Sequence, residues 1–114
     1  MVTVTDSITV ATLERMAVGR FGNLVKAVVD VERGIMVVDA DMHADEEALL
    51  IDDGSHQRSL WGINLHPGKF GTPEFVEYDS MVNLRPSQGN RSKFVEDPRE
   101  RERVDKLVSR LVKP

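Results

Sequence analysis

Hydrophobic residues recur at helical spacing in several parts of the chain. Residues 9–22 carry apolar side chains three and four positions apart, with Thr9 placed to cap the start of a helix and Gly22 to end it. Residues 44–53 combine good helix formers with acids at the start and glycine after the end. This second segment predicts a short helix, with a strand as the alternative.

The C-terminal part has the clearest helical pattern. Asp97 is a capping residue, Pro98 suits the first helical position, and Glu100 follows the cap by three residues, as in a capping box. The residues behind them form an apolar stripe along one helix face, which consists of Val104, Leu107, Val108, Leu111 and Val112. The sequence therefore predicts a long helix whose apolar face packs on the rest of the protein.

Extended segments fall into two pairs. Residues 24–40 contain two β-branched runs around a turn at Gly34, which predicts a hairpin. Residues 60–67 and 74–84 alternate apolar and polar side chains on either side of a loop rich in glycine and proline, which predicts a second hairpin. The order αββαββα indicates an α+β fold with a four-stranded, mainly antiparallel sheet packed on one face by helices.

Size and composition indicate one globular unit. The chain has 114 residues, 40% of them hydrophobic, so we expect a single domain over residues 1–114. It has no cysteine, which excludes disulfides and thiolate chemistry and is compatible with a reducing compartment. It has neither a signal-peptide pattern at its start nor an apolar run long enough to span a membrane. We therefore expect a soluble, cytoplasmic protein without a membrane partner.

Charge is divided unevenly along the chain. The formal net charge is −4, yet residues 1–84 hold 6 Lys and Arg against 14 Asp and Glu, whereas residues 85–114 hold 9 against 5. Two oppositely charged faces of one molecule account for such a division without any partner. An acidic total charge disfavours a dedicated binder of duplex nucleic acid.

The acidic stretch of residues 39–53 is one candidate site. Carboxylates at this density could hold a divalent metal, with His43, Asp45 and Glu46 as ligands. The spacing fits neither a calcium-binding loop nor a zincin motif. A solvated start of an acidic helix explains the same residues, so we assign no metal here and keep these three as the candidate ligands.

A polar face of the predicted sheet is a second candidate. A histidine beside carboxylates suits general acid and base catalysis, and the candidates are His66, Asp79 and, outside the strands, His43. The remaining polar residues expected on this face are Asn64, Glu77 and Asn83, with Lys26 and Asp30 from the first hairpin. The alternative is an ordinary wet face with cross-strand polar pairs.

The loop of residues 85–93 is the third candidate. Cationic and amide side chains surround Gly89, whose freedom to adopt positive φ lets backbone N–H groups converge on an anion. We expect the ligand-binding residues to be Arg85, Gln88, Asn90 and Arg91. The alternative is that these side chains tie the loop to the protein, a role expected most of Arg85 because it stands at a strand end.

Four sequence blocks, "HADEEALL", "GSHQ", "LWGINL" and "RPSQGNRSKFVEDP", occur in this order between Leu13 and Val112. In this combination the chain resembles a family of small prokaryotic proteins known only as a domain of unknown function. The resemblance implies a single compact domain. It implies no activity, cofactor or catalytic residue.

Three functional hypotheses from different classes follow. The first is a binding module in which the 85–93 loop holds a phosphate or carboxylate group of a small ligand. The second is a metal-assisted hydrolase that uses the acidic stretch or the polar sheet face, and it alone requires a cofactor, a divalent metal. The third is a structural or regulatory homodimer formed through an uncovered sheet face. No dinucleotide-binding, P-loop or nucleophile-elbow motif is present, and whether the protein is an enzyme stays open.

Overall fold

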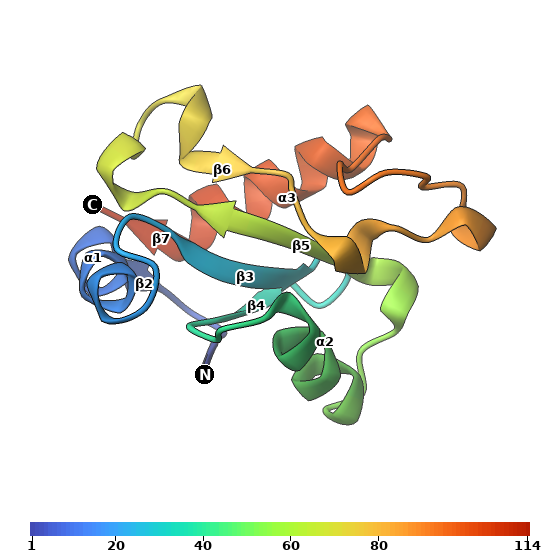
Figure 1. Ribbon diagram of the computed structural model, residues 1–114, viewed down its shortest axis with the longest axis horizontal. Coiled ribbons are helices and arrows are strands. Elements are labelled where there is room, and N and C mark those ends of the chain that lie inside the picture. Colours follow the sequence, from blue (N-terminus) through green and yellow to red (C-terminus); the bar gives the residue numbers. More distant parts are fainter.

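A five-stranded antiparallel sheet forms the centre of the computed structural model, which describes residues 1–114 (Figure 1). The strands lie in the order β1-β4-β3-β5-β6, and each neighbouring pair is antiparallel. Their bounds are Val2–Val4 for β1, Val25–Asp30 for β3, Ile35–Val38 for β4, Leu60–Leu65 for β5 and Val76–Glu77 for β6. A separate two-residue parallel pair joins β2 (Ile8–Thr9) to β7 (Val112–Lys113).

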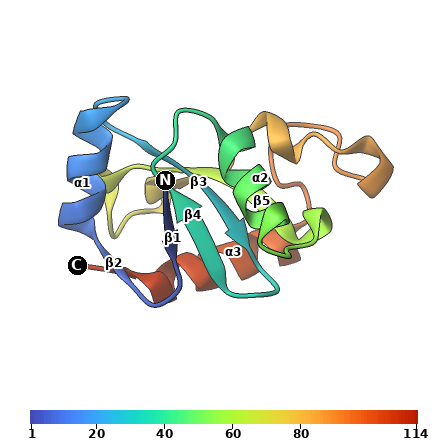
Figure 2. The same cartoon turned by 90° about the horizontal axis from the view of Figure 1, so that it is seen from below.

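Three α-helices lie on the two faces of this sheet. They are α1 (Val10–Gly19), α2 (His43–Asp52) and α3 (Pro98–Leu111). The 3₁₀ helices are shorter and span Gln57–Ser59, Pro67–Lys69, Pro73–Phe75, Met81–Asn83 and Pro86–Gln88. Figures 1 and 2 together show α1 and α3 on one side of the sheet and α2 on the other.

The larger core lies between the sheet and the pair α1 and α3. Leu13 of α1 and Val104 of α3 are fully buried in it, together with alternate residues of the central strand β3, such as Val29. The smaller core lies under α2, where Leu50 meets Val28, the neighbour of Val29 that points to the opposite face. Because β3 is apolar on both faces, the sheet needs cover on both sides.

The prediction of an α+β fold is therefore confirmed, and three of its details are wrong. The sheet has five strands, because Val2–Val4 pairs with β4 as a fifth strand too short to leave a periodic signal. The helices do not share one face, because α2 covers the second face through Leu50. The order αββαββα omitted β1 and the short strands β2 and β7.

The first hairpin is confirmed and the second is much shorter than predicted. Strands β3 and β4 pair over four residues around the turn at Gly34, where φ is 71°. In the second hairpin only Val76–Glu77 pairs with β5. Residues 78–93 leave the sheet in irregular backbone and 3₁₀ turns. The side chain of Asn83 binds the backbone of Gly62 where a continuing strand would have paired.

The predicted helix starts agree with the structure. Thr9 caps α1 by accepting from the Thr12 N–H at 3.2 Å, and Asp97 caps α3 by accepting from the Arg99 N–H at 2.9 Å. Helix α2 lies within one residue of its predicted bounds, while α1 ends at Gly19, before Gly22.

The capping box of α3 is not completed. Glu100, which would reach back to the cap, instead accepts from Trp61 Nε1 at 3.4 Å and pairs with Arg103 at 3.1 Å. None of the helices has both the length and the apolar character needed to cross a membrane.

Candidate functional site

A hollow of about 280 Å³ lies where the start of α2 meets the polar side of β5. We call it the α2 pocket. Four segments of the chain contribute its polar side chains: β3, the start of α2, β5, and the segment that follows β6. Its lining residues are Lys26, Met42, His43, Ala44, Asn64, Asp79, Ser80, Met81, Val82 and Lys93.

The N-terminus of α2 is open at this pocket. Met42 is the N-cap residue, and its side chain forms no capping hydrogen bond. Asp45 N–H reaches back to the Met42 carbonyl at 3.2 Å, whereas the N–H groups of His43 and Ala44 have no hydrogen-bond partner. Unpaired N–H groups at a helix start, together with the helix dipole, favour a negatively charged group.

Two lysines bring positive charge to the pocket. Lys26 lies on β3 opposite Asn64 of β5, and its ammonium group lies 4.8 Å from the centre of the Phe21 ring without any carboxylate partner. Lys93 comes from the end of the 85–93 loop and lies 3.8 Å from an oxygen of Asp79. The pocket therefore holds two cations against one carboxylate, and Lys26 is the unpaired charge.

His43 is held in one tautomer by the sheet. Its Nε2 lies 2.7 Å from the carbonyl oxygen of Ile63, and because a carbonyl only accepts, Nε2 carries the hydrogen. In the neutral ring Nδ1 then holds the free lone pair. Burial lowers the pKa of His43, partly offset by the Ile63 carbonyl, and Lys26 lowers it further. The ring is therefore neutral near pH 7 and able to accept a proton.

Asn64 is buried beside His43 and keeps one polar atom without a partner. Its Nδ2 donates to Glu77 Oε1 at 3.0 Å and to the Asp79 carbonyl at 3.2 Å. Both partners are acceptors, so the amide cannot be reversed. The Oδ1 atom forms no hydrogen bond, although the residue is only 7% exposed, and Asn64 is close enough to His43 to favour the protonated ring. This pocket therefore also offers an acceptor that lacks a donor.

The predicted pair of His66 and Asp79 does not form. His66 Nε2 binds Glu77 Oε1 at 3.0 Å, and this hydrogen bond lowers the pKa of Glu77. Asp79 lies at the α2 pocket instead, with His43. Of the other residues expected on the polar face, Asn83 is buried against Gly62, and Asp30 is buried in the β3–β4 turn, where it accepts from two backbone N–H groups.

Most side chains of the 85–93 loop bind the protein itself. Arg85 is buried over the Trp61 ring at 4.3 Å and donates to the carbonyls of Gln57 and Leu60. Burial lowers the pKa of Arg85. Asn90 donates to three carbonyls in and around the loop and accepts from one N–H group, and Gln88 donates to the Arg58 carbonyl.

Arg91 differs from its neighbours in the loop. It is exposed, and its side chain forms no hydrogen bond, although its N–H is bound by Glu96 at 3.1 Å. Of the four residues expected to bind a ligand, Arg91 alone has a side chain that forms no hydrogen bond. None of the four lines the α2 pocket, and the loop contributes Lys93 to it instead.

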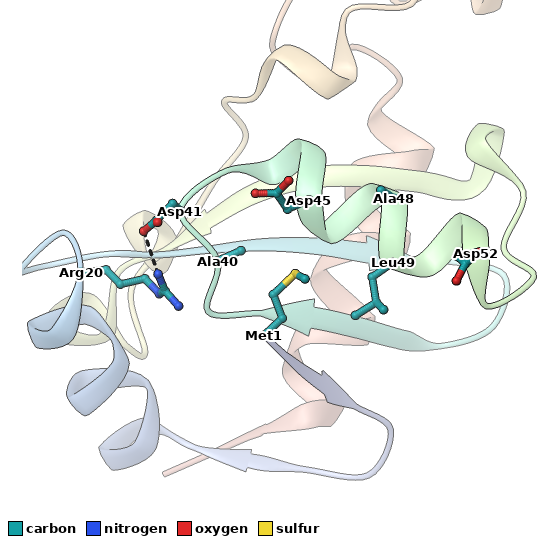
Figure 3. A pocket seen from close by; sticks show the side chains of 8 residues that line it. All are labelled: Met1, Arg20, Ala40, Asp41, Asp45, Ala48, Leu49 and Asp52. Atoms are coloured by element: carbon teal, nitrogen blue, oxygen red, sulfur yellow. Dashed lines mark hydrogen bonds and ion pairs between the residues drawn. The ribbon is translucent and has the colours of Figure 1, made fainter.

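The acidic stretch divides between different surroundings. His43 lines the α2 pocket and Glu46 is fully buried, whereas Asp45 lies in an open hollow of about 600 Å³ on the other side of the helix. Figure 3 shows that hollow, where Asp45, Leu49 and Asp52 of α2 lie across from Met1 and Arg20. No group of three or more His, Asp or Glu side chains is placed to hold a metal ion.

Arg20 orders the chain that leads into α2. Its guanidinium pairs with Asp39 at 2.8 Å and with Asp41 at 2.7 Å. Asp39 has a φ of 70°, in the left-handed region, and the ion pair supports this less common conformation. The pKa of Arg20 is raised by these hydrogen bonds. Arg20 thereby contributes to the position of the open helix end.

Glu46 is an unusual buried group below the pocket. Neither of its oxygens has a hydrogen-bond partner, and the side chain is fully buried. Burial raises the pKa of Glu46 to about 9, and the nearby Ala40 N–H, which does not meet hydrogen-bond geometry, and Lys26 offset part of this rise. A carboxyl group in this environment is neutral at pH 7.

Comparison with known proteins identifies a family for this chain. Residues 2–111 match the family model described as "Protein of unknown function (DUF5674)". The chain belongs to this family. The resemblance to a domain of unknown function is thereby confirmed. No curated protein and no solved structure matches the chain, so the DUF5674 fold must be interpreted from its own residues.

The sequence did not identify the pocket as a unit. It grouped Lys26, Asn64 and Asp79 on the polar sheet face, with His43 as a further candidate, and it assigned Lys93 to the 85–93 loop. A signal was available for one contact, because pairing the two hairpins places Lys26 beside Asn64. The approach of α2 to this face had no sequence signal of its own.

Proposed function

We propose that this DUF5674 domain binds a small ligand through a phosphate or carboxylate group in the α2 pocket. The anionic group lies at the start of α2, where it accepts from the N–H groups of His43 and Ala44. Lys26 and Lys93 contribute charge from the two sides. The observation that carries the proposal is the open helix N-terminus beside Lys26, a cation without a carboxylate partner. In this form the 85–93 loop takes part through Lys93.

The unpartnered Oδ1 of Asn64 narrows the class of ligand. An acceptor that is buried without a donor costs free energy, and a hydroxyl or amino group of the ligand, or a protonated His43, would supply that donor. We therefore favour ligands that carry a hydroxyl or amino group next to the anionic group over simple inorganic anions. Such metabolites are abundant in the cytoplasm, which is where we place the protein.

Thermal unfolding with inorganic phosphate as the probe tests the proposal. A ligand that binds only the folded state adds RT ln(1 + [L]/Kd) to stability, so the wild-type melting temperature should rise with phosphate. Lys26→Met and Lys93→Met keep the apolar stems and should reduce this rise. The matched control is Lys106→Met, because Lys106 lies on α3 and pairs with Glu102 at 3.1 Å. An equal rise in all four proteins would refute the proposal.

The geometry of His43 favours a second candidate function, hydrolysis of the bound ligand. A neutral imidazole whose Nε2 is held by Ile63 can accept a proton from water at Nδ1. The Lys26 charge would stabilise developing negative charge on the substrate. Assays with chromogenic phosphate and carboxylate esters test it, since His43→Gln should remove turnover while phosphate still stabilises the variant. Equal turnover in His43→Gln would rule out this role.

A further inference from the structure

A second hollow, of about 450 Å³, lies between α3 and the segment around β6. We call it the aromatic groove. It is distinct from the α2 pocket, because the two share no lining residue. The groove is lined by Phe70, Gly71, Thr72, Pro73, Phe75, Val76, Tyr78, Asp105, Val108, Ser109 and Val112.

Aromatic rings gather in this groove. Of the six aromatic residues in the chain, it contains Phe70, Phe75 and Tyr78. Phe70 meets Phe75 edge to face at 5.1 Å between ring centres, and it is 39% exposed although it is a large apolar side chain. The faces and edges of such rings suit an apolar group, and a ring face also attracts a cation.

Asp105 is the only charged residue that lines the groove. Its Oδ1 accepts the hydrogen of the Tyr78 hydroxyl, which also contacts the Arg101 carbonyl. Its Oδ2 forms no hydrogen bond, and the carboxylate has no ion pair. Burial, and next the Asp105 carboxylate, raise the pKa of Tyr78 above its ordinary value, so the hydroxyl remains a donor and fixes the carboxylate beside the rings.

The lack of an ion pair is unusual for this helix. Its other acids have cationic partners, since Glu100 pairs with Arg103 and Glu102 pairs with Lys106. The remaining cations point elsewhere: Arg101 donates to the carbonyls of Val95 and Glu96, and Arg110 donates to that of Gly34. Asp105 thus keeps a free carboxylate oxygen in an aromatic groove that contains no cation.

We infer that the aromatic groove is a binding site for a small organic ammonium ion. The apolar walls accept the methyl or methylene groups of the ligand, the rings attract its positive charge, and Asp105 balances that charge. The class includes trimethylammonium and alkylammonium compounds. This site is independent of the anion proposal, because it uses different residues and the opposite charge.

Choline and its neutral carbon isostere, 3,3-dimethyl-1-butanol, form a matched pair of probes for this inference. Titration of the wild-type protein, followed by amide chemical shifts, should show saturable changes at groove residues with choline. The isostere should bind about tenfold more weakly, because it lacks the charge that the rings and Asp105 recognise. Equal binding of both probes, or no choline-dependent shift at the groove, would overturn the inference.

Two variants and a control separate recognition from folding. Asp105→Asn keeps an acceptor for the Tyr78 hydroxyl and removes the charge, so it should weaken choline binding about tenfold and leave the isostere unchanged. Phe70→Ala removes an exposed ring and should weaken the binding of both probes. Glu102→Gln alters a carboxylate of the same helix that pairs with Lys106, and its affinity for both probes should match that of the wild type. Unaltered choline affinity in folded Asp105→Asn would contradict the assignment.

Discussion

The side-chain amide of Asn83 pairs with both backbone groups of Gly62. Its Oδ1 accepts from the Gly62 N–H at 2.8 Å, and its Nδ2 donates to the Gly62 carbonyl at 2.9 Å. The same Nδ2 donates to the Lys93 carbonyl at 2.9 Å. One buried side chain therefore takes the place of a strand beside β5 and also positions the lysine that the loop contributes to the α2 pocket.

Gly62 should not tolerate a side chain. A Cβ at this position would lie 2.5 Å from Ser80 Oγ and 2.8 Å from Val82 Cγ2, so Gly62→Ala should destabilise the protein by about 1–3 kcal/mol. Gly68→Ala is the control, because a Cβ there meets nothing within 4 Å. Urea denaturation of both variants measures the difference, and equal stability would show that this contact is not tight.

Arg85 and Arg91 should behave differently although both were expected to bind a ligand. Arg85→Ala leaves the buried carbonyls of Gln57 and Leu60 without donors and removes the contact with Trp61. The expected loss is about 1–3 kcal/mol for each buried partner left unpaired. Arg91→Ala removes an exposed side chain without hydrogen bonds and should leave stability within about 0.5 kcal/mol of wild type. Chemical denaturation distinguishes the two, and an equal loss would contradict this account of the loop.

Glu46 should make stability fall as the solution becomes more alkaline. Its pKa is about 9 in the folded protein, above the ordinary value of 4.5. The stability that depends on this group is therefore greatest below pH 4.5 and falls as pH rises toward 9. Glu46→Gln cannot ionise, so its free energy of unfolding should increasingly exceed that of the wild type as pH rises from 4.5 to 9, by several kcal/mol near pH 9. Melting curves from pH 5 to 9 measure this. The neighbouring variant Glu47→Gln should follow the wild-type profile, and parallel profiles for Glu46→Gln would mean that Glu46 is not buried as described.

His43 should couple anion binding to proton uptake. Burial lowers its pKa in the free protein, whereas an anion beside the ring favours the protonated form. Sulfate is a suitable probe because its own charge is constant in this range. Its affinity should increase as pH falls from 7.5 to 5.5, by at most about tenfold per pH unit for one coupled proton. In calorimetric titrations the sulfate affinity of His43→Gln should depend less on pH than that of the wild type. The same pH dependence in both proteins would exclude His43 as the coupled group.

Local patterns predicted the helices and the first hairpin well because each depends on residues close in sequence. Asp97 with Pro98, and Thr9 before α1, are capping signals that act within one turn. The end of the sheet was harder to predict. The alternation after Glu77 was typical of a strand. In the structure the side chain of Asn83, rather than a strand backbone, forms hydrogen bonds with the backbone groups of Gly62, and sequence periodicity does not reveal such an arrangement.

The complete candidate site was not predicted, for a related reason. His43 reaches Ile63 across twenty positions, and the carbonyl of Lys93 is held at the pocket by the Asn83 side chain and the Ser80 N–H. These contacts depend on which face α2 covers. Its apolar residues in the smaller core, Leu50 and the partly buried Leu49, did not distinguish one face from the other in the sequence. The alternative that the 85–93 side chains tie the loop to the protein describes the contacts of Arg85 and Asn90.

The most direct test of the central claim is a phosphate titration followed by the amide resonances of ¹⁵N-labelled protein. Our account predicts that the largest saturable shifts occur at the N–H groups of His43 and Ala44, which lack partners in the free protein. They should diminish in Lys26→Met and persist in Lys69→Met, whose side chain lies outside the α2 pocket. Saturable shifts centred on residues 85–91 instead, or changes that stay linear at every phosphate concentration, would contradict the assignment of the α2 pocket as an anion site.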